Sequence, residues 1–253
     1  MILVSPRHRV VNRLHQFLNA NQNSRHREAM MRHQLMHDLH LTFARFGQRI
    51  QIYEPEVDAF GYDIILDDLV RTRRIQLKTK LKKAATSEWK VHKILLRPDI
   101  ANLNIMPFSP DSGGHGYMGG IILTVADVSR DDVRYAYWYS DALVICARHY
   151  GVLAPAAGAQ RRSLATTYRE LTRPDYRPKR VIIRPPCFWS FSSLRPVLAL
   201  AGFDLGYEIQ PRQILVDIVA RHARRVPGPH STELDHKAIH VANNVLRPLL
   251  TDT

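Results

Sequence analysis

Three polar residues in one short stretch carry groups that metal-assisted hydrolysis uses. The stretch Glu54–Lys80 reads EPEVDAFGYDIILDDLVRTRRIQLKTK and contains two strand-like runs joined by a turn. Asp63 is the only carboxylate in the first run, and Gln76 and Lys78 lie two residues apart in the second. Because strand side chains alternate between faces, Gln76 and Lys78 point the same way. Pairing of the two runs therefore predicts a carboxylate, an amide and an ammonium group at one end of a small sheet.

This arrangement resembles the PD-(D/E)XK nuclease superfamily, whose signature is an Asp on one strand and Glu-x-Lys on the next. Here the second half is Gln76-Leu77-Lys78, a Q-x-K variant that resembles forms in some restriction-like and anti-phage effector nucleases. The family usually also has a Glu on the helix before the sheet, and Glu28 is the candidate. The resemblance covers residues 25–140, about half of the chain.

The resemblance implies a nuclease that hydrolyses DNA phosphodiester bonds with Mg²⁺, for which Mn²⁺ can substitute. Asp63 would anchor the ion, and the Gln76 side chain and the Leu77 backbone carbonyl would add the neutral oxygen ligands that hard cations accept. Glu28 would hold a metal-bound water or a second ion. Lys78 would orient the attacking water or stabilise developing charge.

A second interpretation belongs to a different functional class. Gln76 brings no charge and accepts no proton near neutral pH, so the same fold could be a nucleic-acid-binding module without hydrolytic activity. Asp63, Lys78 and Glu28 favour activity. Glu28 also has an ordinary alternative role, because an acidic side chain near the start of a helix stabilises the positive end of the helix dipole.

The charge balance favours a polyanionic partner. Lys plus Arg exceed Asp plus Glu by 36 − 23 = 13 in 253 residues. The segment after Lys78 is basic and contains Trp89, a combination that suits contacts with DNA phosphates, although a solvent-exposed basic loop is the alternative. The candidate nucleic-acid-binding residues are Lys80, Lys82, Lys83 and Lys90.

A sheet and one helix must position these residues. The hydrophobic patterns predict about five strands, over residues 48–53, 62–66, 74–79, 121–125 and 133–139. The expected fold class is α/β, with a restriction-endonuclease-like core of a mixed sheet flanked by helices and a helical C-terminal extension.

The helix expected over residues 25–46 decides whether Glu28 can reach the sheet. Leu35, Leu39 and Phe46 form an apolar stripe, and Gly47 is a plausible helix terminator. Glu28 lies seven residues before Leu35, which is close to two whole turns, so its side chain falls in line with this stripe.

Three regions are expected along the chain. They are an N-terminal helix within residues 1–22, a nuclease-like core over 23–150, and a basic, mostly helical region over 151–253. The last region has a strand pattern at 180–184 and helix patterns within 188–200, 212–225 and 232–250. Its role is open between DNA binding, homodimerisation and contact with a partner protein.

The remaining residue patterns argue against other functions. Cys146 and Cys187 are far apart and lack Cys-x-x-Cys spacing, so no disulfide framework or zinc knuckle is indicated. No apolar run reaches the ~20 residues that span a bilayer. The N-terminus lacks a charged region before its apolar start, so we expect a cytoplasmic protein.

Histidines and one further acid are secondary candidates. His33, His37 and His40 share a helix face, and a solvated or DNA-facing surface explains them better than zinc does, because one helix rarely presents three tetrahedral ligands. His236 and His240 lack the Glu of a metalloprotease motif. Asp58, which lies shortly before Gly61, is either a turn residue or a second acid at the site.

Overall fold

The computed structural model describes residues 13–56, 60–99, 116–129, 132–153, 158–173, 179–223, 240 and 242–251. The strands are β1 (Gln51–Tyr53), β2 (Ile64–Asp67), β3 (Thr72–Leu81), β4 (Trp89–His92), β5 (Gly120–Val128), β6 (Val133–Asp141), β7 (Arg180–Ile183) and β8 (Trp189–Phe191). The α-helices are α1 (Arg13–Asn19), α2 (Ser24–Arg45), α3 (Lys93–Leu96), α4 (Ala142–His149), α5 (Gly158–Thr172), α6 (Leu194–Ala201), α7 (Pro211–Ala223) and α9 (Arg247–Thr251).

A mixed sheet forms the centre of the protein, which confirms the predicted α/β class. Six strands lie in the order β1-β2-β3-β5-β6-β8, where β3 and β5 are parallel and the other neighbours are antiparallel. The five predicted strands are all present with shifted ends, and β8 is the additional one. A separate two-stranded sheet pairs β4 with β7, the strand predicted at 180–184.

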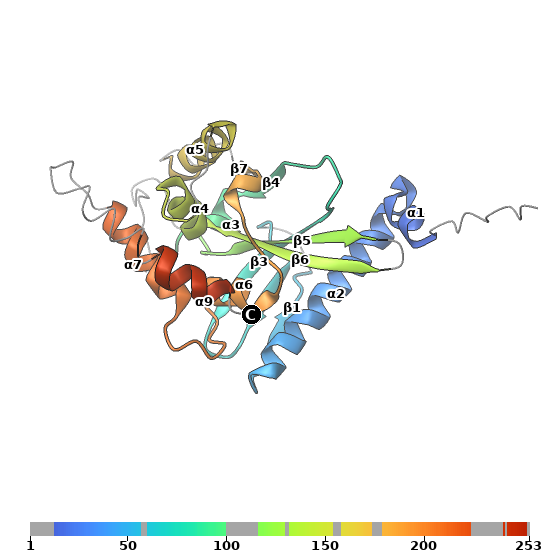
Figure 1. Cartoon of the computed structure of the whole chain (residues 1–253), viewed down its shortest axis with the longest axis horizontal. Coiled ribbons are helices and arrows are strands. Elements are labelled where there is room, and N and C mark those ends of the chain that lie inside the picture. The colour runs from blue at the N-terminus through green and yellow to red at the C-terminus, as the bar shows by residue number, and fades with distance from the viewer. Residues whose placement is uncertain are drawn as a thin grey trace, which may run out of the picture.

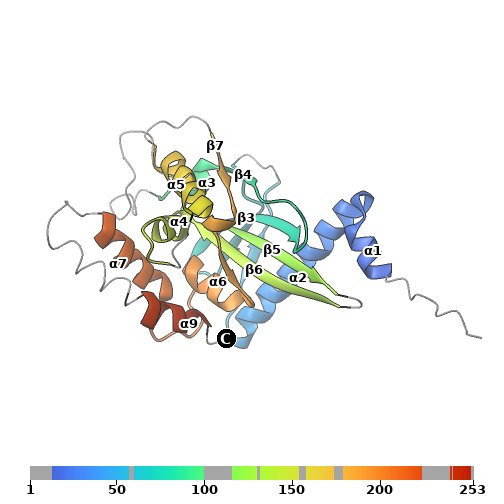
Figure 2. The same ribbon diagram turned by 45° about the horizontal axis from the view of Figure 1, so that its top comes forward.

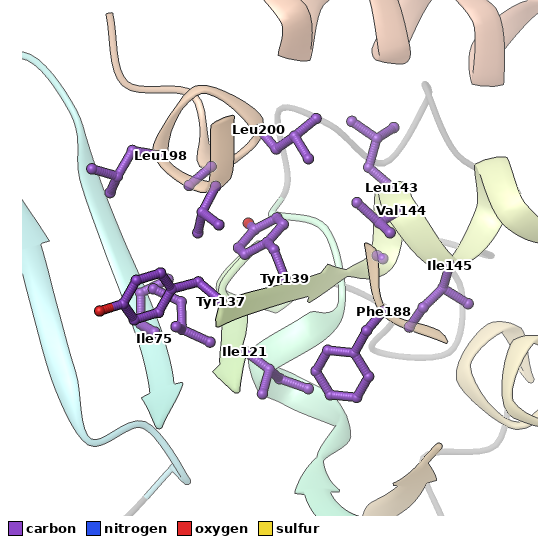
Figure 3. Close-up of a cluster of buried hydrophobic side chains, with 14 of the residues drawn as sticks. Ile75, Ile121, Tyr137, Tyr139, Leu143, Val144, Ile145, Phe188, Leu198 and Leu200 are labelled. Carbon is purple, nitrogen blue, oxygen red and sulfur yellow. The ribbon is translucent and has the colours of Figure 1, made fainter. Parts of the chain in front are cut away.

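Helices cover both sides of this sheet (Figures 1 and 2). The long helix α2 lies along one side, while α4, α5 and the β4–β7 sheet lie together on the other. One hydrophobic cluster includes residues from α2, the six-stranded sheet and the helices after residue 151. Figure 3 shows part of this cluster, in which Tyr139 of β6 lies near Leu200 of α6, and Ile121 of β5 lies near Phe188.

Helix α2 agrees with the prediction within one residue at each end. Leu35 and Leu39 are fully buried, and Phe43 rather than Phe46 continues the buried stripe. Phe46 is the C-terminal cap residue and is only half-buried. Gly47 has φ +67, a left-handed conformation that glycine adopts without strain, and it ends the helix as expected.

The chain outside the core agrees in part with the sequence patterns. The N-terminal helix begins at Arg13 among the described residues, and the expected residues 6–12 lie outside them. The helix predicted within 188–200 is α6, and that predicted over 212–225 is α7. Most of the helix predicted over 232–250 lies outside the described residues, whose final part is a π-helical turn (Ala242–Leu246) followed by α9.

Candidate active site

The β2–β3 ladder ends where the predicted site begins. Ile64 is opposite Ile75 in the antiparallel register, and the Asp63 N–H donates to the Ile75 carbonyl at 2.9 Å. Beyond this point β3 continues to Leu81 with β5 as its neighbour on one side only. Among the described strands, none pairs with the other flank of β3 directly beside Asp63.

The Asp63 side chain takes the place that a further residue of β2 would occupy. Its Oδ2 accepts a hydrogen bond of 2.6 Å from the backbone N–H of Leu77. Because the N–H and C=O of one strand residue point to the same side, the Leu77 carbonyl points to this open flank as well. A carboxylate and a backbone carbonyl thus face the same space.

The approach to β2 requires a glycine. Gly61 has φ +76, and a Cβ atom built on it would lie 2.5 Å from the Cδ2 atom of His92. A larger residue would be strained in this conformation and would collide with the end of β4. Gly61 therefore sets the close packing of the β2 entry against β4 and, through it, the position of Asp63.

A cavity of about 370 Å³ lies at the open flank of β3. It gathers side chains from α2, the start of β2, β3, β4 and β5. The lining residues are Glu28, Arg32, Leu35, Asp63, Leu77, Lys78, Thr79, Trp89 and Thr124. Three of the four predicted catalytic residues, Glu28, Asp63 and Lys78, therefore share one cavity.

One part of the cavity wall belongs to the sheet face that α2 covers. The Tyr137 hydroxyl donates to the Asp38 carboxylate of α2, so Tyr137 faces this helix. Thr124 is opposite Tyr137, and Thr79 is opposite Thr124 in the parallel β3–β5 register. Directly opposed residues project from the same face, which places Thr79 and, two residues before it, Leu77 beneath α2.

The other part of the wall belongs to the opposite face of the sheet. Lys78 lies between Leu77 and Thr79 and projects away from α2. Trp89 of β4 packs edge to face against Phe188, which also contacts Trp138 of β6. Trp138 is opposite Leu123, and Leu123 is opposite Lys78. The cavity thus wraps around the flank of β3 and brings Glu28 from one side and Lys78 from the other.

Gln76 does not line this cavity. It is only 6% exposed, and its Oε1 atom has no hydrogen-bond partner among the residues that the structure describes. The alternation of polar and apolar residues in this strand favours a core position for Leu77, and this expectation is wrong. Gln76 is the more buried of the two residues, and Leu77 lines the cavity. A buried acceptor without a donor is unfavourable and marks a position where a cation or a donor would be stabilising.

Arg32 and Trp89 are cavity residues that the sequence-based prediction of catalytic groups did not include. Arg32 lies one helical turn after Glu28, and its Nη2 atom forms a 2.8 Å ion pair with Oε2 of Glu54. Trp89 contributes an aromatic wall and is 7% exposed. With Glu28 and Asp63 opposed by Arg32 and Lys78, the cavity carries two negative and two positive groups.

The four predicted nucleic-acid-binding lysines differ in their contacts. Lys80 donates to the Thr86 carbonyl at 3.0 Å, and Lys82 forms a 2.6 Å ion pair with Asp127. Lys83 and Lys90 are exposed. Lys90 directly follows Trp89 of the cavity wall, so it is the exposed lysine closest in sequence to the lining residues.

The secondary candidates do not join this site. His33, His37 and His40 are exposed on α2, as predicted, and no group of three His, Cys, Asp or Glu suited to a metal occurs among the described residues. Cys146 and Cys187 are buried free thiols whose pKa values are raised by burial. Asp58 and His236 lie outside the described residues, and no helix within the described ranges is long and apolar enough to cross a membrane.

The donor set suits a hard divalent cation. Asp63 and Glu28 offer carboxylate oxygens, Leu77 offers a backbone carbonyl, and the partnerless Oε1 of Gln76 lies on the residue before it. Mg²⁺ is bound in proteins through one or two carboxylates with several retained waters, so a site with few charged ligands and an open cavity fits its chemistry.

Comparisons of the chain with protein-family models, with curated proteins and with solved structures give no match.

Proposed function

We propose that the chain is a metal-dependent nuclease that hydrolyses DNA phosphodiester bonds, of the restriction-like or phage-defence endonuclease type. The observation that carries this proposal is the cavity at the open flank of β3, which collects Glu28, Asp63 and Lys78 from three different elements. The chain order of these residues, helix then Asp strand then Gln-x-Lys strand, is that of the PD-(D/E)XK pattern.

Each residue of the cavity would have its own role in phosphodiester hydrolysis. Asp63 and the Leu77 carbonyl would hold Mg²⁺ from within the cavity, and the buried amide of Gln76 would have to turn towards it to add a third ligand. The ion supplies charge neutralisation and a water of lowered pKa when bound. Glu28 accepts a hydrogen bond from the attacking water and orients it across the cavity. Lys78 donates to the oxygens of the phosphate group, where negative charge increases during the reaction.

Arg32 supplies a second cation on the α2 side of the cavity. A guanidinium group presents two parallel donors that match a phosphate, whereas the exposed pairing with Glu54 is worth only about 0–1 kcal/mol. A DNA phosphate can therefore replace Glu54 as the partner of Arg32. The net charge of +13 gives the long-range attraction for such a polyanion.

Nicking of supercoiled plasmid by the full chain tests the proposal. We expect relaxed and linear products with 5–10 mM Mg²⁺ or 1 mM Mn²⁺ (roughly physiological to saturating concentrations for weak oxygen sites), and intact plasmid with EDTA. The Asp63→Asn variant is the matched control for a contaminating nuclease. Equal nicking by both proteins would mean that the activity does not depend on Asp63 and would remove the support for the proposal.

The alternative function is a nucleic-acid-binding module without hydrolysis. The burial of Gln76 outside the cavity favours it, because this residue stands where the commoner pattern has a charged metal ligand. An electrophoretic mobility shift assay with linear fragments of the same plasmid separates the two functions. Retarded but uncut DNA in Mg²⁺ and in Mn²⁺ would support the binding module instead of the nuclease.

A further inference from the structure

A second cavity, of about 520 Å³, lies near the start of β3 and shares no lining residue with the candidate active site. Arg71 and Arg73 line it from the start of β3, and Gln210 and Arg212 line it from the start of the 13-residue helix α7. Its size is within the ~300–1,000 Å³ of small-molecule sites.

Hydrogen bonds to groups outside the cavity lining hold two arginines of this cavity in place. Nη1 of Arg212 donates to the Asp141 carboxylate at 2.7 Å and to the Leu200 carbonyl, while Nε of Arg73 donates to the Ala201 carbonyl at 2.5 Å. These contacts fix both guanidinium groups against the C-terminal end of α6. Their orientation is thus set by the fold before any ligand binds.

The same cavity contains a donor and an acceptor that have no partner within the part of the chain that the structure describes. Arg212 is 8% exposed, and its Nη2 group makes no hydrogen bond to any described residue. Oε1 of Gln210 is likewise buried without a donor from these residues. Buried polar groups are nearly always satisfied, so an orphan donor and an orphan acceptor that line one cavity indicate a ligand that supplies both partners.

The local electrostatics favour an anion. Arg71, Arg73 and Arg212 line the cavity together with one carboxylate, Glu208, while Asp141 lies behind Arg212. The pKa of Arg73 is lowered, first by burial and then by the charge of Arg212, against weaker opposing contributions from Tyr139, Asp141 and Asp99. The start of α7 adds the positive end of a helix dipole on the same side.

We propose that this cavity binds a small organic phosphate of about the size of a nucleoside monophosphate. The phosphate group occupies the space between Arg71, Arg73 and the Nη2 group of Arg212. An N–H or O–H of the organic part donates to Oε1 of Gln210, and the apolar side chains of Met118 and Val216 cover the rest. The site is independent of the proposed nuclease activity.

Isothermal titration calorimetry on the full chain tests the proposal with inorganic phosphate and with AMP, GMP, CMP and UMP as probes. We expect at least one nucleotide to bind with a 1:1 stoichiometry and more tightly than phosphate alone. Arg71→Gln should weaken this binding about tenfold, because a charge-assisted hydrogen bond is lost. Arg49→Gln, an exposed arginine that lines a neighbouring cavity and not this one, should leave it unchanged.

Gln210→Leu gives a second test, in which ligand affinity should fall while the thermal midpoint of the free protein rises. The variant loses the acceptor for the ligand and should bind it more weakly, yet it also loses a buried unsatisfied atom, so its thermal midpoint without ligand should rise. The backbone carbonyl of Gln210, which accepts from Gln213 N–H at 3.0 Å, is retained. Asp63→Asn should bind the nucleotide normally, which separates this site from the nuclease site.

Three results would overturn the proposal. The first is the absence of binding for all five probes at millimolar concentration, which would mean that water fills the cavity. The second is an equal loss of affinity in Arg71→Gln and Arg49→Gln, which would indicate non-specific charge attraction. The third is complete displacement of the nucleotide by short duplex DNA, which would make the cavity part of a DNA-binding surface.

Discussion

The Asp63 carboxylate accepts a 2.6 Å hydrogen bond from the backbone N–H of Leu77 and thereby closes the β2–β3 ladder at the candidate active site. The hydrogen bond gives this carboxylate a structural role, and its negative charge is what the proposed chemistry requires. The two roles can be separated by substitution, because an amide keeps the acceptor and loses the charge.

Asp63→Asn should abolish cleavage, by roughly 100-fold or more, because the metal loses its anchoring charge. Its unfolding free energy in urea should stay close to that of the wild type, whereas Asp63→Ala should lose about 1–2 kcal/mol with the Leu77 hydrogen bond. Asp132→Asn, an exposed carboxylate paired with Arg134, is the control. Wild-type nicking by Asp63→Asn would remove Asp63 from the site.

Lys78→Ala should slow cleavage about 100-fold with little change in DNA affinity, because its ammonium group acts on charge that develops during the reaction. Single-turnover cleavage and fluorescence anisotropy measure the two quantities. Lys90→Ala removes an exposed cation beside the same wall and should affect affinity and salt dependence instead. Matched losses of rate and affinity in Lys78→Ala would make Lys78 a simple phosphate contact.

Gln76→Glu should keep activity and lower the Mg²⁺ concentration that gives half-maximal cleavage, because a charged oxygen replaces a neutral one. Gln76→Ala should require more Mg²⁺ and cut slowly. Cleavage rates across one Mg²⁺ titration of the three proteins decide this point. Identical curves would show that Gln76 is not a ligand.

The burial of Gln76 adds a stability test of the same assignment. Burial raises the pKa of the carboxyl group introduced by Gln76→Glu, so folding takes up a proton above pH ~4.3. In EDTA the variant should therefore lose stability relative to the wild type as the pH rises from 5 to 8. Added Mg²⁺ should restore its thermal midpoint at pH 8, and a midpoint insensitive to both pH and Mg²⁺ would contradict burial at a metal site.

Arg32→Ala should reduce cleavage and DNA affinity together, because its guanidinium group would hold a substrate phosphate in the ground state as well as during the reaction. Glu54→Gln is the matched control, since it breaks the same 2.8 Å ion pair but keeps the cation in the cavity. We expect the control to cut DNA at least as fast as the wild type. Equal impairment of both variants would mean that the ion pair serves the structure only.

Tyr137→Phe should lower the unfolding free energy by about 1–2 kcal/mol, because the hydroxyl bridges β6 to Asp38 of α2. Burial, and then this hydrogen bond, raises the pKa of Tyr137 above its ordinary value of 10. This stabilising contribution is complete below pH 10 and is lost as the pH rises towards the folded-state pKa. Urea titrations at pH 8 and pH 10.5 should therefore show a smaller difference between wild type and variant at the higher pH.

The elements that carry the motif were predictable from the sequence because their signals are local. Alternation marks β3, a long apolar stripe marks α2, and a glycine with positive φ ends that helix at residue 47. Helix α4 lacks such a signal, since nearly all of its eight residues are buried and apolar and no face stands out. Its start is marked only by Asp141, whose carboxylate accepts from Val144 N–H at 2.8 Å.

The candidate site was predictable only in part, because one part of it is set by tertiary contacts. Asp63 and Lys78 follow from strand pairing, and Glu28 follows from helical spacing. The role of Arg32 as a cavity residue depends on how α2 lies on the flank of β3, which no local pattern encodes. The burial of Gln76 depends likewise on the packing on the face of the sheet away from α2.

The short strand β8 has a consequence for any attempt to isolate the nuclease-like region. Trp189–Phe191 pairs with Tyr137–Tyr139 and covers the outer backbone of β6. A fragment that stops at residue 150 would leave the N–H and C=O groups of an aromatic strand free to pair with another molecule, which is a common route to aggregation. The C-terminal part of the chain thus keeps this edge of the sheet from pairing with another molecule.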